Sequence, residues 1–243
     1  MDLELSPDQT DLRDELRRFL DAEVTSERRR AAADLPGAVD RDLWAALSEL
    51  GAFTVAVPES DGGVGLGWAE ATIVFEELGQ AATPGPLVGT AVARAHGIDD
   101  DVVGLVSRAA PALVEHAGGL DALLVVDGRS AAVVHGAADA LRGETVKRPL
   151  DPLTPVTIVT ELPAGEAAGD AAAIVGQAAL LAAAQQVGLA DAAVALAVAC
   201  IQVHGGIGYT WELDAHLLLK RVLVLDQTPM TPVEAQEAIA TNL

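Results

Sequence analysis

The sequence predicts a mainly helical protein with a small β module between two helical parts. Three observations support this prediction. Apolar residues recur at helical spacing through the first hundred residues, and an alanine-rich stretch from about residue 170 to 203 favours helix. Between them, Asp127-Gly128 separates two short apolar runs, which is typical of a β-hairpin. We therefore place the domains at residues 1–98, 99–168 and 169–243.

Composition narrows the class of protein before any motif is considered. The chain has 243 residues, of which 51% are hydrophobic, so a sizeable core is expected. Its formal net charge of −21 argues against nucleic acid and anionic membrane surfaces as partners. The N-terminus shows no secretory pattern, and the longest apolar run, near residues 178–184, is too short to cross a bilayer. We expect a cytoplasmic protein without a membrane partner.

The first helix has a clear start signal. Ser6 is predicted as its N-cap, with Pro7 at the first helical position and Gln9 completing a capping box. Apolar spacing then predicts an amphipathic surface helix to about Arg30. The basic residues 28–30 suit either a cationic helix C-terminus or a ligand site, and we favour the helix terminus.

Further helices are predicted on both sides of a glycine-rich loop. Asp40 is expected to cap a second helix that Gly51 ends, followed by an extended stretch at residues 54–58. The loop at residues 59–67 lacks the Gly-Lys-Ser/Thr of a phosphate-binding P-loop. Helices are then predicted from Trp68 to Leu78, closed by Gly79, and over residues 87–96.

The middle and the end of the chain have different patterns. Strands are predicted at residues 120–126, 131–135 and 156–159, giving a small β module over about 120–162. The helix over residues 170–203 is apolar almost all round, so we expect it to be buried between other elements, with Gly188 as a candidate break. Residues 212–225 are again periodic.

The catalytic and metal-binding patterns of several classes are missing from the sequence. The five histidines lack the close spacing of a zinc site, so no metal is expected. No serine lies in a Gly-x-Ser-x-Gly elbow, and no Gly-x-Gly-x-x-Gly opens a helix after a strand. Cys200 lies in an apolar run and is interpreted as a small buried hydrophobe. Spacing selects no pair of carboxylates, so the catalytic residues stay unassigned.

One glycine-rich turn near the C-terminus has two interpretations. Gly205, Gly206 and Gly208 follow the long helix, and Gln202 precedes them by one helical turn. Glycine amides at such a place form ready sites for anionic groups such as a pyrophosphate. A corner between two helices, where glycines relieve crowding, explains the same residues. The chemistry of these residues alone leaves both interpretations open.

Residues 202–212, Gln-Val-His-Gly-Gly-Ile-Gly-Tyr-Thr-Trp-Glu, resemble the C-terminal signature of acyl-CoA dehydrogenases. Residues 6–19, 50–66, 75–79, 150–155, 183–188 and 212–221 resemble other segments of that family in the same order, most closely its short actinobacterial members. The resemblance implies an N-terminal helical domain, a reduced middle β-domain and a shortened C-terminal helical bundle.

The resemblance also implies an activity and a cofactor. Acyl-CoA dehydrogenases are FAD-dependent oxidoreductases of lipid metabolism that desaturate an acyl-CoA between its α and β carbons. It further implies that Gln202, Gly205, Gly206 and Gly208 lie against the FAD pyrophosphate of a neighbouring subunit. The expected partners are therefore an acyl-CoA or related thioester, and a second chain in a homodimer or in a heteromer with a longer paralogue.

Three departures from the family pattern support alternatives to an independent enzyme. A basic, aromatic segment and two long helices expected after residues 187–190 are missing. The β region contains no Trp, Tyr or Phe. The Tyr-Glu-Gly-Thr segment that bears the catalytic base in the family is also absent, and residues 225–229 stand near its place. One alternative is a catalytically degenerate subunit that completes the FAD site of a paralogue. The other is a non-redox protein that binds acyl thioesters.

Overall fold

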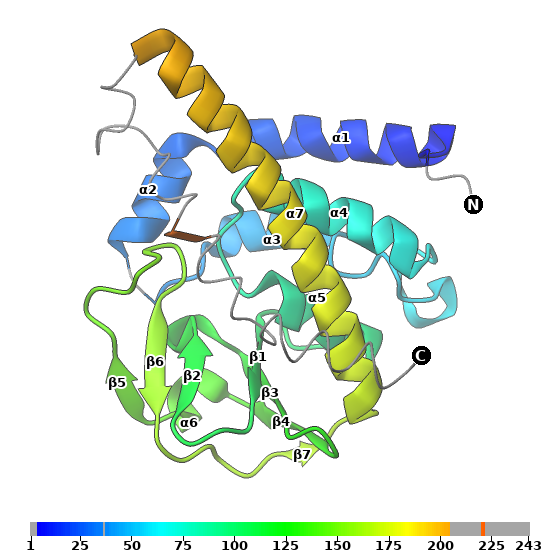
Figure 1. The fold of residues 1–243 in the computed structure, drawn as a ribbon. Coiled ribbons are helices and arrows are strands. Elements are labelled where there is room, and N and C mark those ends of the chain that lie inside the picture. The colour runs from blue at the N-terminus through cyan, green and yellow to red at the C-terminus, as the bar shows by residue number, and fades with distance from the viewer. Residues whose placement is uncertain (1–3, 36, 205–219, 222–243) are drawn as a thin grey trace.

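The computed structural model describes residues 4–35, 37–204 and 220–221 of the chain. In this part, a group of helices comes first, strands occupy the middle, and one long helix follows, crossing in front of the others (Figure 1). The helices are α1 (Pro7–Glu23), α2 (Ser26–Asp34), α3 (Arg41–Glu49), α4 (Trp68–Gln80), α5 (Leu87–Ala95), α6 (Ala137–Ala140) and α7 (Ala171–His204), with 3-10 turns η1 (Glu59–Asp61) and η2 (Ala117–Gly119). The strands are β1 (Val103–Ser107), β2 (Ala112–Glu115), β3 (Ala122–Val126), β4 (Ala131–His135), β5 (Gly143–Thr145), β6 (Val156–Val159) and β7 (Glu166–Ala167).

The start of α1 confirms the predicted capping box. The Ser6 hydroxyl accepts a hydrogen bond from the Gln9 backbone N–H, and the Gln9 side chain accepts one from the Ser6 N–H. Gln9 also donates from its amide to the Glu70 carboxylate of α4 at 2.8 Å. The cap therefore fixes α1 both to its own first turn and to a helix that lies far along the chain.

The predicted extent of the first helix is wrong. The helix ends at Glu23 instead of continuing to Arg30, because Thr25 takes extended backbone and caps a new helix, α2. Arg28 pairs with the Glu23 carboxylate at 2.8 Å and donates to the Glu23 carbonyl, while Arg29 donates to the carbonyl of Val24. These basic residues thus satisfy the carbonyls at the end of α1 and not those of their own helix.

The region around α3 confirms two sequence signals and contradicts a third. Asp40 caps α3 by accepting from the Leu43 N–H, and Gly51 follows the helix with left-handed φ of 80°. Residues 54–56 lie in turns and Val57 in a bend, instead of the predicted extended stretch. The reason is the glycine-rich loop behind them: a Cβ at Gly63 would stand 2.1 Å from the Val57 carbonyl oxygen, so the loop packs directly on this turn.

The β module is larger than the sequence predicted. Its strands extend from Val103 to Ala167 and form two sheets, with strand orders β1-β3-β4-β7 and β2-β6-β5. The Asp127-Gly128 hairpin is confirmed, since β3 and β4 pair antiparallel and Gly128 has a φ of 81°. The sequence did not predict β1. Val103–Ser107 is short and pairs in parallel with β3, so it has no adjacent hairpin turn that would indicate a strand. The overall result is a helix-rich fold with a small β module, as predicted.

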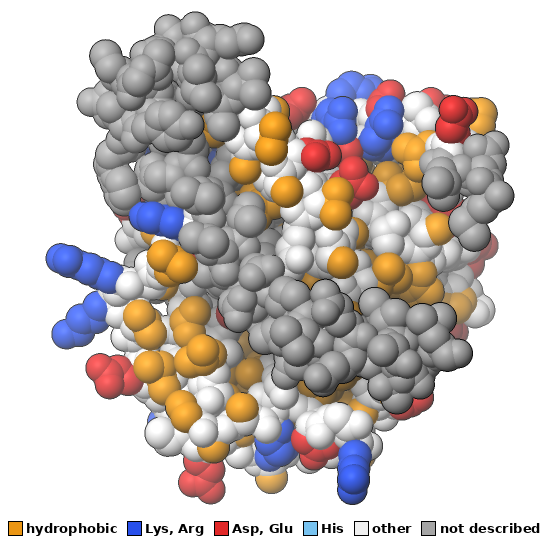
Figure 2. Space-filling model, in the orientation of Figure 1, with side chains coloured by type: hydrophobic (Ala, Val, Ile, Leu, Met, Phe, Trp, Pro, Cys, Tyr) orange, Lys and Arg blue, Asp and Glu red, His pale blue; other side chains and the backbone are white. Residues whose placement is uncertain are grey.

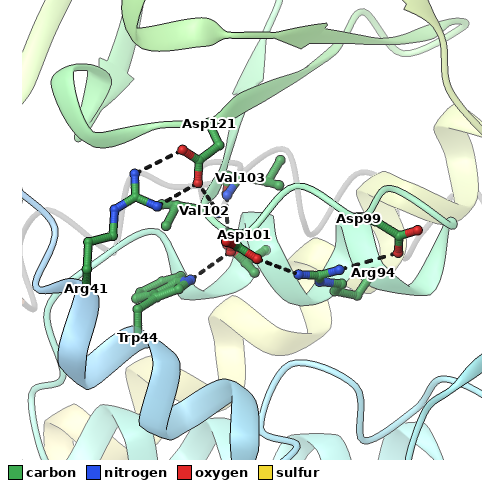
Figure 3. Close-up of polar contacts among 9 residues, drawn as sticks. Arg41, Trp44, Arg94, Asp99, Asp101, Val102, Val103 and Asp121 are labelled. Carbon is green, nitrogen blue, oxygen red and sulfur yellow. Dashed lines mark hydrogen bonds and ion pairs between the residues drawn. The ribbon is translucent and has the colours of Figure 1, made fainter.

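Polar contacts between three segments fix the helices to this β module (Figure 3). Arg41 of α3 forms a two-armed ion pair with Asp121, with N–O distances of 2.6 and 3.0 Å. Asp121 also accepts from the Val102 N–H at 3.0 Å, and its pKa is lowered chiefly by the hydrogen bond from Arg41. The Trp44 indole N–H donates to the Asp101 carbonyl at 2.8 Å. The start of the first sheet is therefore held against α3.

Two glycines allow α7 to cross α4 at very short range. A Cβ at Gly188 would stand 1.8 Å from the Glu76 carbonyl oxygen, and one at Gly79 would stand 2.0 Å from the Gln185 carbonyl oxygen. The prediction of a break at Gly188 is wrong, because α7 continues through it. The predicted end of α4 at Gly79 is confirmed to within one residue, since the helix ends at Gln80. Helix backbones come this close only where no side chain lies between them.

The burial expected for α7 is also corrected. Only one side of the helix is covered: Leu181 and Leu189 are fully buried, whereas Leu180, Val187 and Val194 are 42%, 53% and 65% exposed. Residues 171–196 are also long and apolar enough to cross a membrane, contrary to the expectation from the sequence. This is weak evidence for a membrane span, because helices of soluble proteins pass the same test and α7 packs here against α4 and α5.

Candidate functional site

The predicted cofactor residues lie at the edge of the described part of the chain. Gln202 is in the last turn of α7, but its side chain is outside the described residues. Gly205, Gly206 and Gly208 are outside them altogether. Their assignment to a flavin pyrophosphate therefore stays a prediction, and any site among the described residues rests on contacts of its own.

Backbone strain and unpaired polar groups coincide at two places in the described chain. Ala82 and His116 are its non-glycine residues with positive φ, at 50° and 52°. Such backbone costs roughly 1–2 kcal/mol for a residue that carries a Cβ. The buried side-chain atoms without a hydrogen-bond partner there are Thr83 Oγ1 and His116 Nδ1. Unexplained strain and unpaired polar atoms together mark a candidate site.

Arg221 connects these two places. It is 2% exposed, and its Nη2 donates to the Thr83 carbonyl at 2.9 Å. Its Nη1 lies 3.3 Å from Thr154 Oγ1 and 3.5 Å from Asp151 Oδ2. Asp151 is fully buried and accepts from the Leu153 N–H at 2.9 Å and from Thr154 Oγ1 at 2.5 Å. A buried cation thus joins the α4–α5 linker to the segment before β6.

The electrostatics of this cluster keep its histidine neutral. Burial, and secondarily the charge of Arg221, lowers the pKa of His116 to about 3. Burial raises the pKa of Glu115. The charge of Arg221 acts to lower this pKa, and the Asp151 carboxylate acts to raise it further. The neutral His116 ring has one N–H and one acceptor nitrogen, so its Nδ1 is available to a neutral donor or acceptor.

Two cavities adjoin His116. The larger, of about 360 Å³, is open to the surface and lies at the lower end of the usual range for ligand pockets. Its lining residues are Gly37, Ala38, Ala117, Gly118, Thr145, Pro155 and Thr157. The smaller, of about 10 Å³, includes His116 and shares Ala38 and Pro155 with the larger one. It has the size of a single water, which would satisfy the unpaired ring nitrogen.

Sequence reasoning did not find this cluster. Arg221 falls in the periodic segment at residues 212–225 and in the resemblance, and His116 is one of five histidines without ligand spacing. Thr83 and Arg221 are 138 positions apart, so no local pattern relates them. In the described residues, no group of three or more His, Cys, Asp or Glu side chains is placed to hold a metal ion.

Acyl-CoA dehydrogenases are among the known proteins that are similar to this chain in sequence and fold. Residues 6–98 match the family profile "Acyl-CoA dehydrogenase, N-terminal domain". Acyl-CoA dehydrogenase IpdE2 of Mycolicibacterium smegmatis is 39% identical over 83 residues, covering 34% of this chain and 27% of that protein. IpdE2 of Mycobacterium tuberculosis is 28% identical over 273 aligned positions, covering 79% of this chain and 83% of that protein. The ChsE4-ChsE5 complex of Mycobacterium tuberculosis superposes with a TM-score of 0.61 at 17% identity, covering 93% of this chain and 76% of that one.

The class that these features define is the acyl-CoA dehydrogenase fold, with helices before and after a β module. Residues 6–98 match the N-terminal domain of the acyl-CoA dehydrogenases, and most of the chain is similar to a member of that family. The longer alignment also shows an internal difference in length. Since 79% of 243 residues is about 192, about 81 of the 273 aligned positions have no residue of this chain opposite them.

FAD is the cofactor that members of this family generally bind. The described residues of one chain do not form a site that fits the whole dinucleotide. The larger cavity has no aromatic ring in its lining, and the β module over residues 99–168 contains no Phe, Trp or Tyr to cover an isoalloxazine. A complete FAD site would therefore need residues from outside the described part, from a second chain, or from both.

Proposed function

We propose that the chain is a subunit of an FAD-dependent acyl-CoA dehydrogenase that introduces a double bond between the α and β carbons of an acyl-CoA thioester. The profile match over residues 6–98 and the resemblance of residues 202–212 to the family signature support this activity. When bound, FAD would supply the oxidising power of the reaction. The solved structures of similar fold include the ChsE4-ChsE5 complex, which supports a heteromer for this chain.

The observation that carries this proposal is the course of α7. The helix begins at Ala171, soon after β7 and the backbone hydrogen bond from Ala168 to Ala131 of β4, and runs without a break to His204 (Figure 1). At 1.5 Å per residue, Gln202 lies about 46 Å along the helix from Ala171. Gln202 is therefore far along α7 from the point where this helix leaves the β module of its own chain. We infer that Gln202 serves a flavin that a second chain holds.

A catalytically degenerate partner subunit is the second candidate function. It is favoured by the absence of aromatic residues from the β module, since the chain itself then offers no wall for a flavin ring. In this case Gln202 and the glycine turn of this chain complete the FAD site of a paralogue. The paralogue supplies the catalytic base and binds the flavin ring. Both candidates require an assembly, and they differ in whose β module faces the cofactor.

Visible spectra separate these candidates. The chain is purified alone and together with a longer acyl-CoA dehydrogenase paralogue, and acyl-CoA is added anaerobically to each. A flavin spectrum in the lone chain that bleaches with acyl-CoA supports the enzyme, and a spectrum in the mixture alone supports the partner subunit. Flavin that binds neither preparation contradicts both.

A substitution in the glycine turn tests the role of the signature. Gly206→Val should abolish flavin retention in whichever preparation is coloured, because a side chain would occupy the space expected for the pyrophosphate. Gly176→Val is the matched control, because Gly176 lies on an exposed part of α7 where an added Cβ would have no atom within 4 Å. Retention that survives Gly206→Val contradicts the assignment of this turn.

A further inference from the structure

An apolar row runs along the outer face of α7. It consists of Leu180, Ala183, Val187, Ala190 and Val194, and every one of them is exposed. Their spacings of three and four residues repeat every seven positions, which is the pattern of a helix that packs along a second helix. Figure 2 shows hydrophobic side chains along the path of α7 on this face. We call these five residues the α7 row.

The α7 row is not part of the core of its own chain. The opposite side of the helix packs on α4 through Gly188, and Leu181 and Leu189 are fully buried there. The row itself remains exposed, with Val194 at 65% and Val187 at 53%. A contiguous exposed apolar stripe of this kind marks an interaction surface.

The charge around the row limits what covers it. Asp191 is the one charged residue between Ala171 and Val203, so the helix presents no basic group to an acidic partner. Pairing two copies would bring together twice the formal charge of −21. Such self-repulsion disfavours a second copy and favours a partner with Lys or Arg beside its apolar contact residues.

The length difference from the relative points to the kind of partner. About 81 positions of the alignment with the Mycobacterium tuberculosis protein have no residue of this chain opposite them. The relative therefore has about 81 aligned residues more than this chain, and two helices of about 40 residues, each roughly 60 Å long, would need that many. A longer family member has this additional length of chain with which to cover the row.

We propose that the α7 row docks lengthwise against a helix of a second, longer acyl-CoA dehydrogenase chain. The partner helix has large apolar residues at heptad spacing, which fill the space over Ala183 and Ala190, and basic residues beside them that face Asp191. The proposal rests on the proposed function, because the partner is an acyl-CoA dehydrogenase. It adds the surface: Gln202 lies eight residues, or about 12 Å, beyond Val194 on the same helix, so docking carries the signature to the partner.

The test compares a double variant of the row with a single variant elsewhere, each mixed with the longer paralogue. Val187→Gln with Val194→Gln replaces two exposed row residues, and Leu113→Gln on β2 replaces a residue that is 60% exposed. Exposed substitutions leave stability nearly unchanged, which thermal unfolding verifies. Light scattering coupled to size exclusion then measures the mass. The row variant should weaken the complex at least tenfold in dissociation constant, and the β2 variant should not.

Three results would overturn the docking proposal. In the first, the complex with the paralogue survives the row variant. In the second, the lone chain is a dimer that the row variant dissociates, which identifies a second copy as the occupant. In the third, a cysteine placed at Val194 in a Cys200→Ala background resists maleimide in the lone chain, which shows that residues 205–243 cover the row. A complex that forms through the row and holds no flavin would contradict the proposed function and leave the docking proposal standing.

Discussion

Gly188 of α7 lies against the backbone carbonyl of Glu76 on α4, so closely that a Cβ at position 188 would stand 1.8 Å from that oxygen. No side chain separates the two helices at this point. The oxygen belongs to the backbone of a packed helix and cannot move away like the end of a flexible side chain. The crossing of α4 and α7 therefore depends on glycine at this position.

Gly188→Ala should destabilise the fold by about 3 kcal/mol or more, because overpacking between two backbones forces the helices apart. Gly176→Ala is the matched control on the same helix, since no atom lies within 4 Å of the added Cβ. That control should stabilise the chain by about 0.5–1 kcal/mol, through the higher helix propensity of alanine. Urea unfolding followed by circular dichroism measures both. Equal effects of the two substitutions would contradict the close crossing.

Arg17→Ala should destabilise the fold by about 2–3 kcal/mol, because it breaks a pair with a buried carboxylate. Arg17 forms a two-armed pair with Glu77, at 2.6 and 2.8 Å, and the Glu77 side chain is only 3% exposed. Removing the cation leaves that carboxylate buried without its partner, although the exposure of Arg17 reduces the loss below that of a fully buried pair. Arg13→Ala removes an exposed pair with Asp14 and should cost less than about 1 kcal/mol. The free energies of unfolding in urea decide the comparison.

His116 should make the fold sensitive to acid. Its pKa is lowered from 6.5 to about 3 in the folded chain, so the unfolded chain binds more protons between those values. Stability should therefore rise with pH across this window and be lost as pH falls through it, at up to about 1.4 kcal/mol per pH unit. Glu115, whose pKa is raised, acts in the opposite direction, while Arg221 and Asp151 face the same cluster.

His116→Asn should flatten the acid side of the stability profile, because asparagine does not titrate and tolerates left-handed backbone. The measurement is the free energy of unfolding at a series of pH values from about 4 to about 7, the range over which the unfolded histidine takes up its proton. His135→Asn is the control, since that histidine is half exposed on the end of β4. A profile that keeps its slope in His116→Asn would show that other groups control the acid sensitivity.

Arg221→Met should destabilise the fold by about 2–4 kcal/mol. The substitution removes the hydrogen bond to the Thr83 carbonyl and leaves the Asp151 carboxylate buried without a cation. Arg129→Met, at an exposed loop residue, should change stability by less than about 0.5 kcal/mol. Limited proteolysis with mapping of the cleavage sites adds a local readout, with faster cleavage after residue 204 expected in Arg221→Met alone. Unchanged cleavage and stability would mean that Arg221 does not anchor its segment.

Local signals in the sequence determined much of the secondary structure. The capping box of Ser6 and Gln9, the Asp40 cap and the Asp127-Gly128 hairpin each depend on residues close to one another in the chain. Such signals act through the backbone of the same turn, so they can be recognised in the sequence without knowledge of the fold. The signature at residues 202–212 likewise pointed to the family, which the profile match over residues 6–98 supports from the other end of the chain.

The tertiary structure alone decided which side of α7 is buried and what its glycine does. Alanine, leucine and valine occur on every side of this helix, so its sequence lacks the polar face that would reveal its orientation. The gathering of Thr83, His116 and Arg221 was equally hidden, since it joins residues up to 138 positions apart. Contacts of this kind form because distant elements pack together, and only their packing shows which apolar face of α7 is left exposed.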